Sequence, residues 1–247
     1  VTALLKNPNT NSINDDDTMT GAYALGSPNR SWNTPLQRDK NLSGYWKFDE
    51  GTGTIAYDYS GNNNTATWSG TGTHWITLSS GEKASIYNGA DDYLTIANSS
   101  SLAITTSTTI SAWVSASTST TYLPIWSGTT GGSNGPLAIS MSWDFRLYID
   151  SVMRYAESPN NSLPVNTFQH VVCTYDGSEM ALWLNGIKQT PTSITGLIIA
   201  GTTSKNIGKM GSAYKWNGTI DEVRIYSRAL NSEEINTIYN KTKNEYQ

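Results

Sequence analysis

Short runs in which apolar and polar residues alternate recur along most of the chain. Residues 108–114 show the pattern well, and residues 168–175 and 180–184 form the clearest pair, joined by a turn that contains Gly177. A period of two, interrupted by turn residues at short intervals, is typical of antiparallel strands. The pattern predicts an all-β protein in which two antiparallel sheets pack as a sandwich. Further strands are expected at residues 45–48, 55–57, 66–68, 84–87, 93–96, 122–126, 137–143, 145–149, 153–156, 187–189, 206–208 and 218–226.

The rhythm changes after residue 226, where the pattern favours a helix. Ile235 and Ile238 are three residues apart, and Asn231 or Ser232 stands just before two acidic residues. Asn and Ser cap the first turn of a helix, and acidic residues in that turn interact favourably with the helix dipole. We expect one short C-terminal helix over residues 231–239, with its apolar side against a sheet.

The expected strand at residues 218–226 contains an irregularity. Apolar residues run along it, but Asp221 and Glu222 interrupt the alternation. Asp is disfavoured in the interior of a strand. The interruption therefore indicates a β-bulge, a turn, a buried hydrogen bond or a metal ligand at Asp221.

Residues 1–43 differ from the rest of the chain, because they show little alternation and carry an acidic run at residues 15–17. We expect them to form a lead-in to a sandwich domain of residues 44–243. The chain begins with Val1 rather than Met, so we expect a mature or trimmed form whose targeting or anchoring element lies upstream. The side chains expected to pack the lead-in on the domain are Tyr23, Leu25, Trp32 and Leu36.

Charge and motifs exclude several classes of function. The 247-residue chain has 16 Lys and Arg against 20 Asp and Glu, and no basic patch stands out, so nucleic acid is not an expected partner. No phosphate-binding Gly loop, dinucleotide fingerprint or Cys/His cluster for zinc occurs in the sequence. The one cysteine, Cys173, lies in an apolar run and is expected to be a small buried hydrophobic residue.

A set of ordered motifs resembles the laminin-G-like, concanavalin A-like lectin and glucanase family over residues 44–240. The resemblance implies a jelly roll of two curved sheets. It also implies a family whose members bind carbohydrate, mediate adhesion or bind protein, with catalysis in some branches, so the fold alone does not fix the function. The motifs that carry it are residues 44–53, 58–62, 88–94, 109–114, 169–177, 182–186 and 218–230.

A shorter resemblance concerns the lead-in. Residues 4–6, the acidic loop and residues 23–26 are similar to the segment that follows the N-terminal helix of type IV pilin-like proteins. This resemblance implies a hydrophobic helix upstream of Val1 and self-assembly into a filament. A structural filament subunit with a laminin-G-like head is therefore the alternative function.

A calcium site is the principal candidate site. The resemblance implies a metal held by the side chains of Asp58 and Asp221 and by backbone carbonyls near Glu50 and in the loop that contains Asn62 and Asn64. Carboxylate, amide and carbonyl oxygens are the ligands that Ca²⁺ prefers, and this ion would be structural because it would join distant segments. The alternative is that Asp58 and Asn62 cap turns and that Asp221 binds a neighbouring amide.

A glycan site requires exposed aromatic faces and polar groups. Trp113 and Trp183 lie inside strand motifs and are expected in the core. Other aromatic residues lie near loops or strand ends and are expected to be more exposed. The candidate ligand-binding residues are Tyr122, Trp126, Asn134, Trp143 and Tyr214.

Catalysis is not expected. Glycoside hydrolysis needs two carboxylates about 5–10 Å apart, and the paired acids that glucanases of this superfamily carry on one strand have no counterpart in this chain. His170 lies in a strand motif and is expected to pack. The sequence thus predicts a non-catalytic, calcium-stabilised binding or adhesion module, extracellular or at the cell surface, that recognises a glycan or a surface protein. A glycoside hydrolase is the least favoured alternative.

Overall fold

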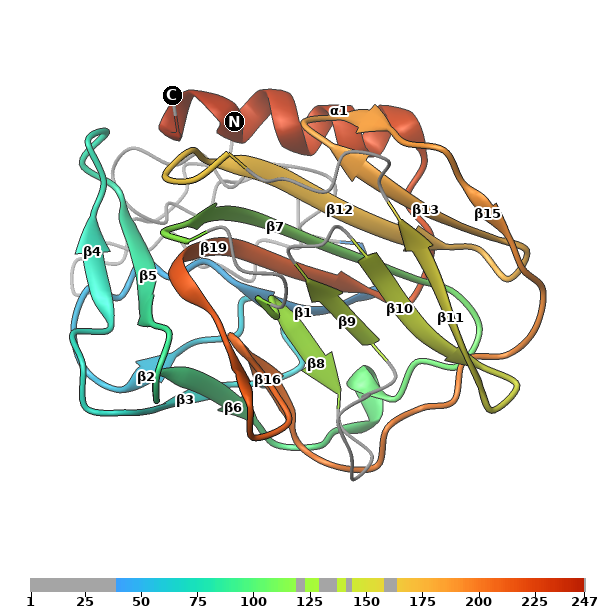
Figure 1. The fold of residues 1–247 in the computed structure, drawn as a ribbon, viewed down its shortest axis with the longest axis horizontal. Coiled ribbons are helices and arrows are strands. Elements are labelled where there is room, and N and C mark those ends of the chain that lie inside the picture. Colours follow the sequence, from blue (N-terminus) through green and yellow to red (C-terminus); the bar gives the residue numbers. More distant parts are fainter. Residues whose placement is uncertain (1–38, 119–122, 129–136, 141–143, 158–163, 247) are drawn as a thin grey trace, which may run out of the picture.

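The structure is a computed structural model that describes residues 39–246, except residues 119–122, 129–136, 141–143 and 158–163. Almost all of its regular elements are strands (Figure 1). In chain order they are β1 (Leu42–Trp46), β2 (Ile55–Ala56), β3 (Ala66–Ser69), β4 (Trp75–Thr77), β5 (Lys83–Asn88), β6 (Tyr93–Ile96), the 3₁₀ turn η2 (Ser100–Leu102), β7 (Thr108–Ala116), β8 (Trp126–Gly128), β9 (Leu137–Ser140), β10 (Asp144–Ile149), β11 (Val152–Glu157), β12 (Gln169–Tyr175), β13 (Glu179–Leu184), β14 (Ile187–Lys188), β15 (Thr192–Ser193), β16 (Lys205–Ile207), β17 (Lys209–Met210), β18 (Tyr214–Lys215), β19 (Asn217–Tyr226), α1 (Ser232–Thr242) and η3 (Lys243–Glu245).

The strands form two large antiparallel sheets, as the alternation predicts. The first has the order β14-β13-β12-β7-β19-β5-β4, with β1 beside β19 and β15 beside β13. The second has the order β11-β10-β9-β8-β16-β6-β3-β2. A small ribbon of β17 and β18 connects β16 to β19. The predicted all-β jelly-roll sandwich with a short C-terminal helix is confirmed.

The main core lies between the two sheets and is rich in aromatic side chains. Trp46, Trp126, Trp216 and Phe145 are each at most 1% exposed, and apolar residues of both sheets surround them. Large aromatic rings supply much of the buried apolar area of such a core. Cys173 is also buried here, as its apolar context predicts.

Helix α1 covers the outer face of the first sheet (Figure 1). Leu230, Ile235 and Ile238 form a second apolar cluster with residues of β12 and β13, including Trp183. The helix begins as predicted, because the Asn231 side chain accepts the backbone N–H of Glu234, whose carboxylate accepts the N–H of Asn231. The cap fixes where the helix starts, and its apolar side fixes which face of the sheet it covers.

The irregularity in the last long strand is a β-bulge, one of the possibilities that the sequence left open. The register of β19 against β7 shifts between Asp221 and Arg224, and Glu222 has a φ of +52°. Tyr45 of β1 donates its hydroxyl to the Glu222 carboxylate at 2.9 Å, and Arg224 forms an ion pair with the same carboxylate. Arg224 also donates to the Tyr45 hydroxyl at 2.7 Å, and all three side chains are buried. The bulge thus brings a paired charge into the interface of β1 and β19.

Several strand boundaries differ from the prediction, and two of the differences have a clear local cause. The expected strand at residues 45–48 is shifted to Leu42–Trp46, since Phe48 has a φ of +61° and leaves the extended region. The strand expected at residues 122–126, for which Pro124 indicates an edge position or a bulge, begins only at Trp126 and lies inside the sheet between β9 and β16. Proline lacks an N–H for the ladder, so the strand starts after it.

Residues 1–38 of the predicted lead-in lie outside the described residues, and its last two residues, Leu42 and Ser43, belong to β1, so the sandwich begins slightly before residue 44. Residues 1–38 include Tyr23, Leu25, Trp32 and Leu36 and the residues that carry the pilin-like resemblance. Filament assembly therefore stays a prediction. Within the part of the chain that the structure describes, no helix is both long and apolar enough to cross a membrane.

The buried ion pair gives a stability prediction. Arg224→Met leaves the Glu222 carboxylate buried without its counter-charge, and we expect a loss of about 3–5 kcal/mol in the free energy of unfolding, measured with urea. The double variant E222Q/R224M removes both charges and should lose less than R224M. Arg154→Met changes an exposed arginine of β11 and should shift stability by less than about 0.5 kcal/mol. Equal stability of R224M and R154M would contradict this role.

Candidate functional site

The loop after Asp58 is organised by the carboxylate of that residue. Its Oδ1 accepts the backbone N–H groups of Tyr45 and Ser60, each at 2.9 Å. Its Oδ2 accepts the Ser60 hydroxyl and the N–H of Asn64, each at 2.8 Å. One carboxylate therefore ties both ends of the loop to β1.

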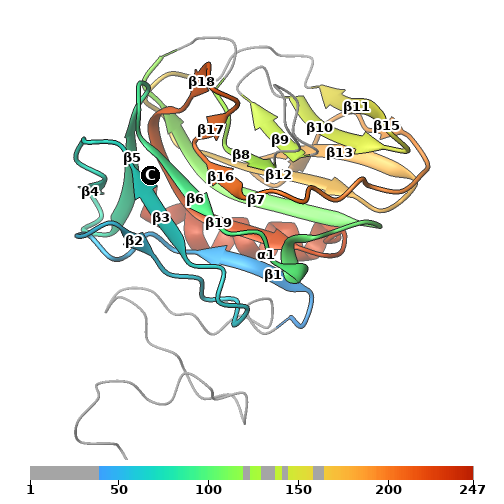
Figure 2. The same ribbon diagram turned by 90° about the horizontal axis from the view of Figure 1, so that it is seen from below.

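Two amide side chains fasten the same loop to its neighbours. Asn62 donates its Nδ2 to the carbonyls of Leu42 and Ser43, at 2.9 and 3.2 Å. Asn64 donates to the Ser43 carbonyl at 2.7 Å and to the Ser101 hydroxyl at 2.9 Å. The loop is thus joined to β1 and to η2, which lie side by side (Figure 2).

A polar groove runs between the loop, β1 and η2. Its volume is about 560 Å³, within the range of ligand-binding clefts. Most of its lining side chains carry a hydroxyl, an amide or an ammonium group, and none of the described residues that line it is acidic. The polar lining residues are Lys40, Ser43, Asn62, Ser100, Ser101, Thr105, Thr106 and Ser227.

The five residues predicted to bind calcium do not share one set of contacts. Asp58, Asn62 and Asn64 are together in the loop, but both oxygens of Asp58 already accept protein donors. Asp221 accepts the N–H of Glu222 and the hydroxyl of Tyr246, and β1 lies between its strand and the Asp58 segment. These contacts match the alternative in which the acids bind neighbouring donors. In the described residues, no group of three or more Asp, Glu, His or Cys side chains is placed to hold a metal.

Glu50 is the predicted ligand whose surroundings best fit a cation. Its Oε1 accepts the N–H of Tyr57 at 2.9 Å, while its Oε2 is buried and has no hydrogen-bond partner. Burial raises the pKa of Glu50, and the hydrogen bond from Tyr57 and the charge of Lys47 oppose that rise. A buried carboxylate oxygen without a donor is stabilised by a nearby cation.

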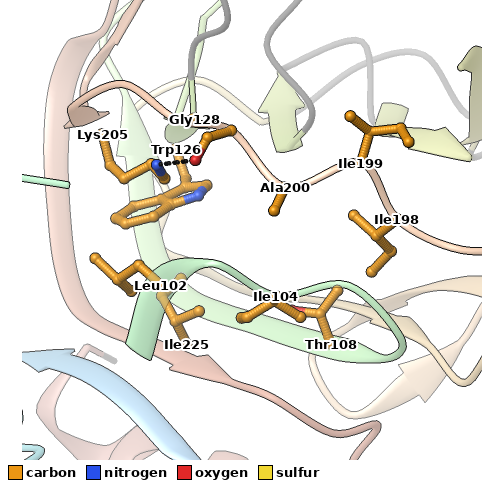
Figure 3. A pocket seen from close by; sticks show the side chains of 11 residues that line it. Leu102, Ile104, Thr108, Trp126, Gly128, Ile198, Ile199, Ala200, Lys205 and Ile225 are labelled. Atoms are coloured by element: carbon orange, nitrogen blue, oxygen red, sulfur yellow. Dashed lines mark hydrogen bonds between the residues drawn. The ribbon is translucent and has the colours of Figure 1, made fainter. Parts of the chain in front are cut away.

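The expectation of an exposed Trp126 is wrong. It is 1% exposed, because its ring packs 5.6 Å from that of Trp46 inside the core. Beside it is a cavity of about 30 Å³, too small for a sugar, with Lys205 at one end and apolar side chains such as Leu102 and Ile225 opposite (Figure 3). Tyr214 is half-buried in the β17–β18 ribbon, away from the groove. Tyr122, Asn134 and Trp143 lie outside the described residues.

A serine–histidine pair is buried beneath α1. Ser111 Oγ and His170 Nε2 are 2.9 Å apart, and both residues are 0% exposed. The ring of Trp113 packs 5.2 Å from that of His170. Burial and the charge of Arg224 lower the pKa of His170 to about 3. The imidazole is therefore neutral near pH 7 and closed to solvent, so His170 packs as predicted.

Sequence reasoning missed most of the groove. Ser100, Ser101, Thr105 and Thr106 form a polar run between two strands, but such runs are frequent in this chain. Ser227 follows β19, more than a hundred residues later. Among the groove residues, the sequence singles out only Asn62, because it lies in the motif at residues 58–62.

Comparison with protein families decides the assignment. The model of the concanavalin A-like lectin/glucanases superfamily matches residues 88–236, more than half of the chain. The chain belongs to this superfamily. The resemblance inferred from the ordered motifs is confirmed. No curated protein sequence matches the chain significantly.

Several solved structures share this concanavalin A-like fold. Domain 4 of AbnA, a GH43 extracellular arabinanase from Geobacillus stearothermophilus solved in complex with arabinotriose, has a TM-score of 0.67 and 20% identity over 81% of this chain and 98% of that one. The binding domain of Paraclostridial Mosquitocidal Protein 1 has a TM-score of 0.66 and 18% identity over 84% of this chain and 53% of its own. A structure of botulinum neurotoxin type C, whose cell entry depends on interaction with two ganglioside molecules, has a TM-score of 0.62 and 13% identity over 84% of this chain and 52% of its own. The chain thus spans about half of the two toxin structures, and at these identities the likeness shows the fold.

The low pKa of His170 gives a pH prediction. Its pKa of about 3 is below the unfolded value of 6.5, so its contribution to stability is complete above pH 6.5 and is lost as the pH falls towards 3. Between pH 6.5 and 4.5 we expect the wild type to lose about 1.4 kcal/mol more per pH unit than His170→Gln, measured by urea unfolding. Parallel stability profiles of the two proteins would show that His170 protonates freely in the fold.

Proposed function

We propose that this concanavalin A-like domain is a non-catalytic carbohydrate-binding module that acts outside the cell or at its surface. Its ligand is a saccharide carried by a glycan or a surface macromolecule. The observation that carries the proposal is the polar groove between the Asp58 loop, β1 and η2. The groove residues Asn62 and Ser101 are held by hydrogen bonds to the protein, so the site is preorganised.

The chemistry of the groove suits sugar hydroxyls. Serine and threonine hydroxyls both donate and accept, and an amide offers two donors and one acceptor, which complements a polyhydroxylated ring. Lys40 adds a cation at one end. Because no Asp or Glu among the described residues lines the groove, those residues offer no acid–base pair for glycoside hydrolysis, which favours binding over cleavage.

The similar structures support the same class of ligand. AbnA domain 4 was solved with arabinotriose, and botulinum neurotoxin type C depends on gangliosides for cell entry. Both observations concern those proteins. They support a saccharide or a glycan-bearing receptor as the partner here, and leave the identity of the sugar to experiment.

Groove variants test the proposal. A glycan array, followed by calorimetry with the neutral oligosaccharide that binds best, should give affinities that fall about tenfold or more in Thr105→Ala/Thr106→Ala, because polar contacts to the ligand are lost. Both threonines are exposed, so the fold should be unchanged. The matched control is Thr71→Ala/Thr73→Ala, two exposed threonines outside the groove, and its affinity should equal that of the wild type. Similar affinities for both double variants, or no bound glycan, would reject the groove as the site.

The second part of the proposal is a structural calcium ion at Glu50. Its support is the buried oxygen of Glu50 without a hydrogen-bond partner, next to the segment that leads into the Asp58 loop. Backbone carbonyls and waters would complete the coordination, as is usual for Ca²⁺. The hydrogen bonds that Asp58 and Asp221 accept from the protein support structural roles for both carboxylates.

Calcium removal tests this part. We expect millimolar Ca²⁺ to raise the melting temperature of the wild type above its value in EDTA, by mass action on the folded state. Glu50→Gln should abolish that shift, whereas Asp221→Asn should keep it, although its baseline stability falls. The assignment would be refuted if calcium did not change the melting temperature of the wild type, or if it raised that of E50Q by the same amount.

A further inference from the structure

The β17–β18 ribbon holds two lysines face to face. Lys209 of β17 pairs directly with Lys215 of β18 in the antiparallel register. Like charges in directly opposite positions destabilise a sheet. Both residues are half-buried, and Lys215 is further fixed by donating its Nζ to the Ser212 carbonyl at 2.9 Å. The repulsion is therefore built into an ordered part of the fold.

Both ammonium groups converge on one aromatic ring. Lys209 Nζ lies 3.8 Å and Lys215 Nζ 5.8 Å from the centroid of the Tyr93 ring. Tyr93 pairs across the sheet with Ser69, and a hydrogen bond from Ser69, together with Lys209 and the charge of Lys215, lowers the pKa of the Tyr93 hydroxyl. The ring positions the two cations, and the hydroxyls add neutral hydrogen-bonding groups beside them.

The two lysines form a like-charged pair in the part of the chain that the structure describes. Neither lysine takes part in an ion pair there, and the pKa of Lys215 is lowered by burial and by the charge of Lys209. The two lysines thus place two positive charges side by side in a chain whose net charge is −4.

We propose that Lys209 and Lys215 bind the anionic group, carboxylate or sulfate, of an acidic saccharide. The proposal rests on the carbohydrate binding proposed above and names the class of sugar. An anion between the two ammonium groups accepts charge-assisted hydrogen bonds from both and removes their mutual repulsion. The Tyr93 and Ser69 hydroxyls can contact neighbouring sugar hydroxyls. Tyr214, an aromatic residue predicted from the sequence to contact a glycan, belongs to the same ribbon.

Calorimetry with three defined probes tests the site. The probes are an oligogalacturonide hexamer for carboxylate, a heparin hexasaccharide for sulfate and a neutral galactan hexamer. The wild type should bind at least one acidic probe more tightly than the neutral one, and this preference should shrink as salt is raised. The acidic probe that binds more tightly shows whether the site prefers carboxylate or sulfate.

Matched charge variants assign that binding to the two lysines. Lys209→Gln/Lys215→Gln should weaken the acidic probe about tenfold or more, while Lys241→Gln/Lys243→Gln, the same charge change at the C-terminal helix, should not. Lys209→Arg/Lys215→Arg keeps both charges and should retain binding, which separates lost charge from lost fold. Equal acidic binding in the two Gln double variants, or no preference for an acidic probe, would overturn the proposal.

The same variants separate this site from the groove. If neutral saccharides bind at the groove and acidic saccharides bind no more tightly than neutral ones, the lysine site is refuted while the proposed function stands. If no saccharide binds but inorganic sulfate shifts the amide NMR signals of Tyr93 and Lys215 in the wild type and not in K209Q/K215Q, the anion site stands and the proposed function fails. If sulfate shifts nothing, the anion site is refuted independently of any sugar.

Discussion

A buried charge has to be paired, and this constraint fixes the join between the first and last strands of the sandwich. Glu222 lies within the interface of β1 and β19, where an isolated carboxylate would cost several kcal/mol. The bulge of β19 lets Arg224 reach the same carboxylate, and Tyr45 of β1 completes the network. The bulge is thus the backbone distortion that allows the pair to form.

The candidate groove depends on that join through a short series of contacts. β1 is held against β19 by the network, and the backbone of Tyr45 in turn donates to Asp58. Asp58 closes the loop that places Asn62 beside Ser43 and Asn64 beside Ser101. A substitution in the Glu222–Arg224 ion pair should therefore alter the groove, because each step between them is a direct hydrogen bond or a strand pairing.

The polar features of the domain divide into buried and accessible groups with different roles. Glu222, Arg224, His170 and Ser111 are buried, with an ion pair between the first two and a hydrogen bond between the last two, so they belong to the packing of the fold. The hydroxyls of the groove and the ammonium groups of the β17–β18 ribbon reach the surface and are available to a ligand. This division agrees with a binding module of the concanavalin A-like superfamily. The superfamily also contains enzymes, so the proposed binding role rests on the groove rather than on the fold.

The sequence by itself determined what depends on near neighbours along the chain. Period-two alternation gave the strands, the Asn231 cap gave the start of the helix, and the interrupted alternation at Asp221 located the bulge. Burial of Trp113, Trp183 and Cys173 also followed from their positions in apolar strands. These signals are local, since side-chain direction and capping are set within a few residues.

Only the tertiary structure decided which distant residues meet. The groove combines residues near 40, 62, 101 and 227, and the lysine pair meets Tyr93 across more than a hundred residues of chain. Trp126, next to a loop in the sequence, is buried because Trp46 packs against it. Asp58 and Asp221, each a reasonable metal ligand by residue type, bind separate donors because β1 runs between them. Residue type and spacing carry no information on such non-local contacts, which packing alone selects.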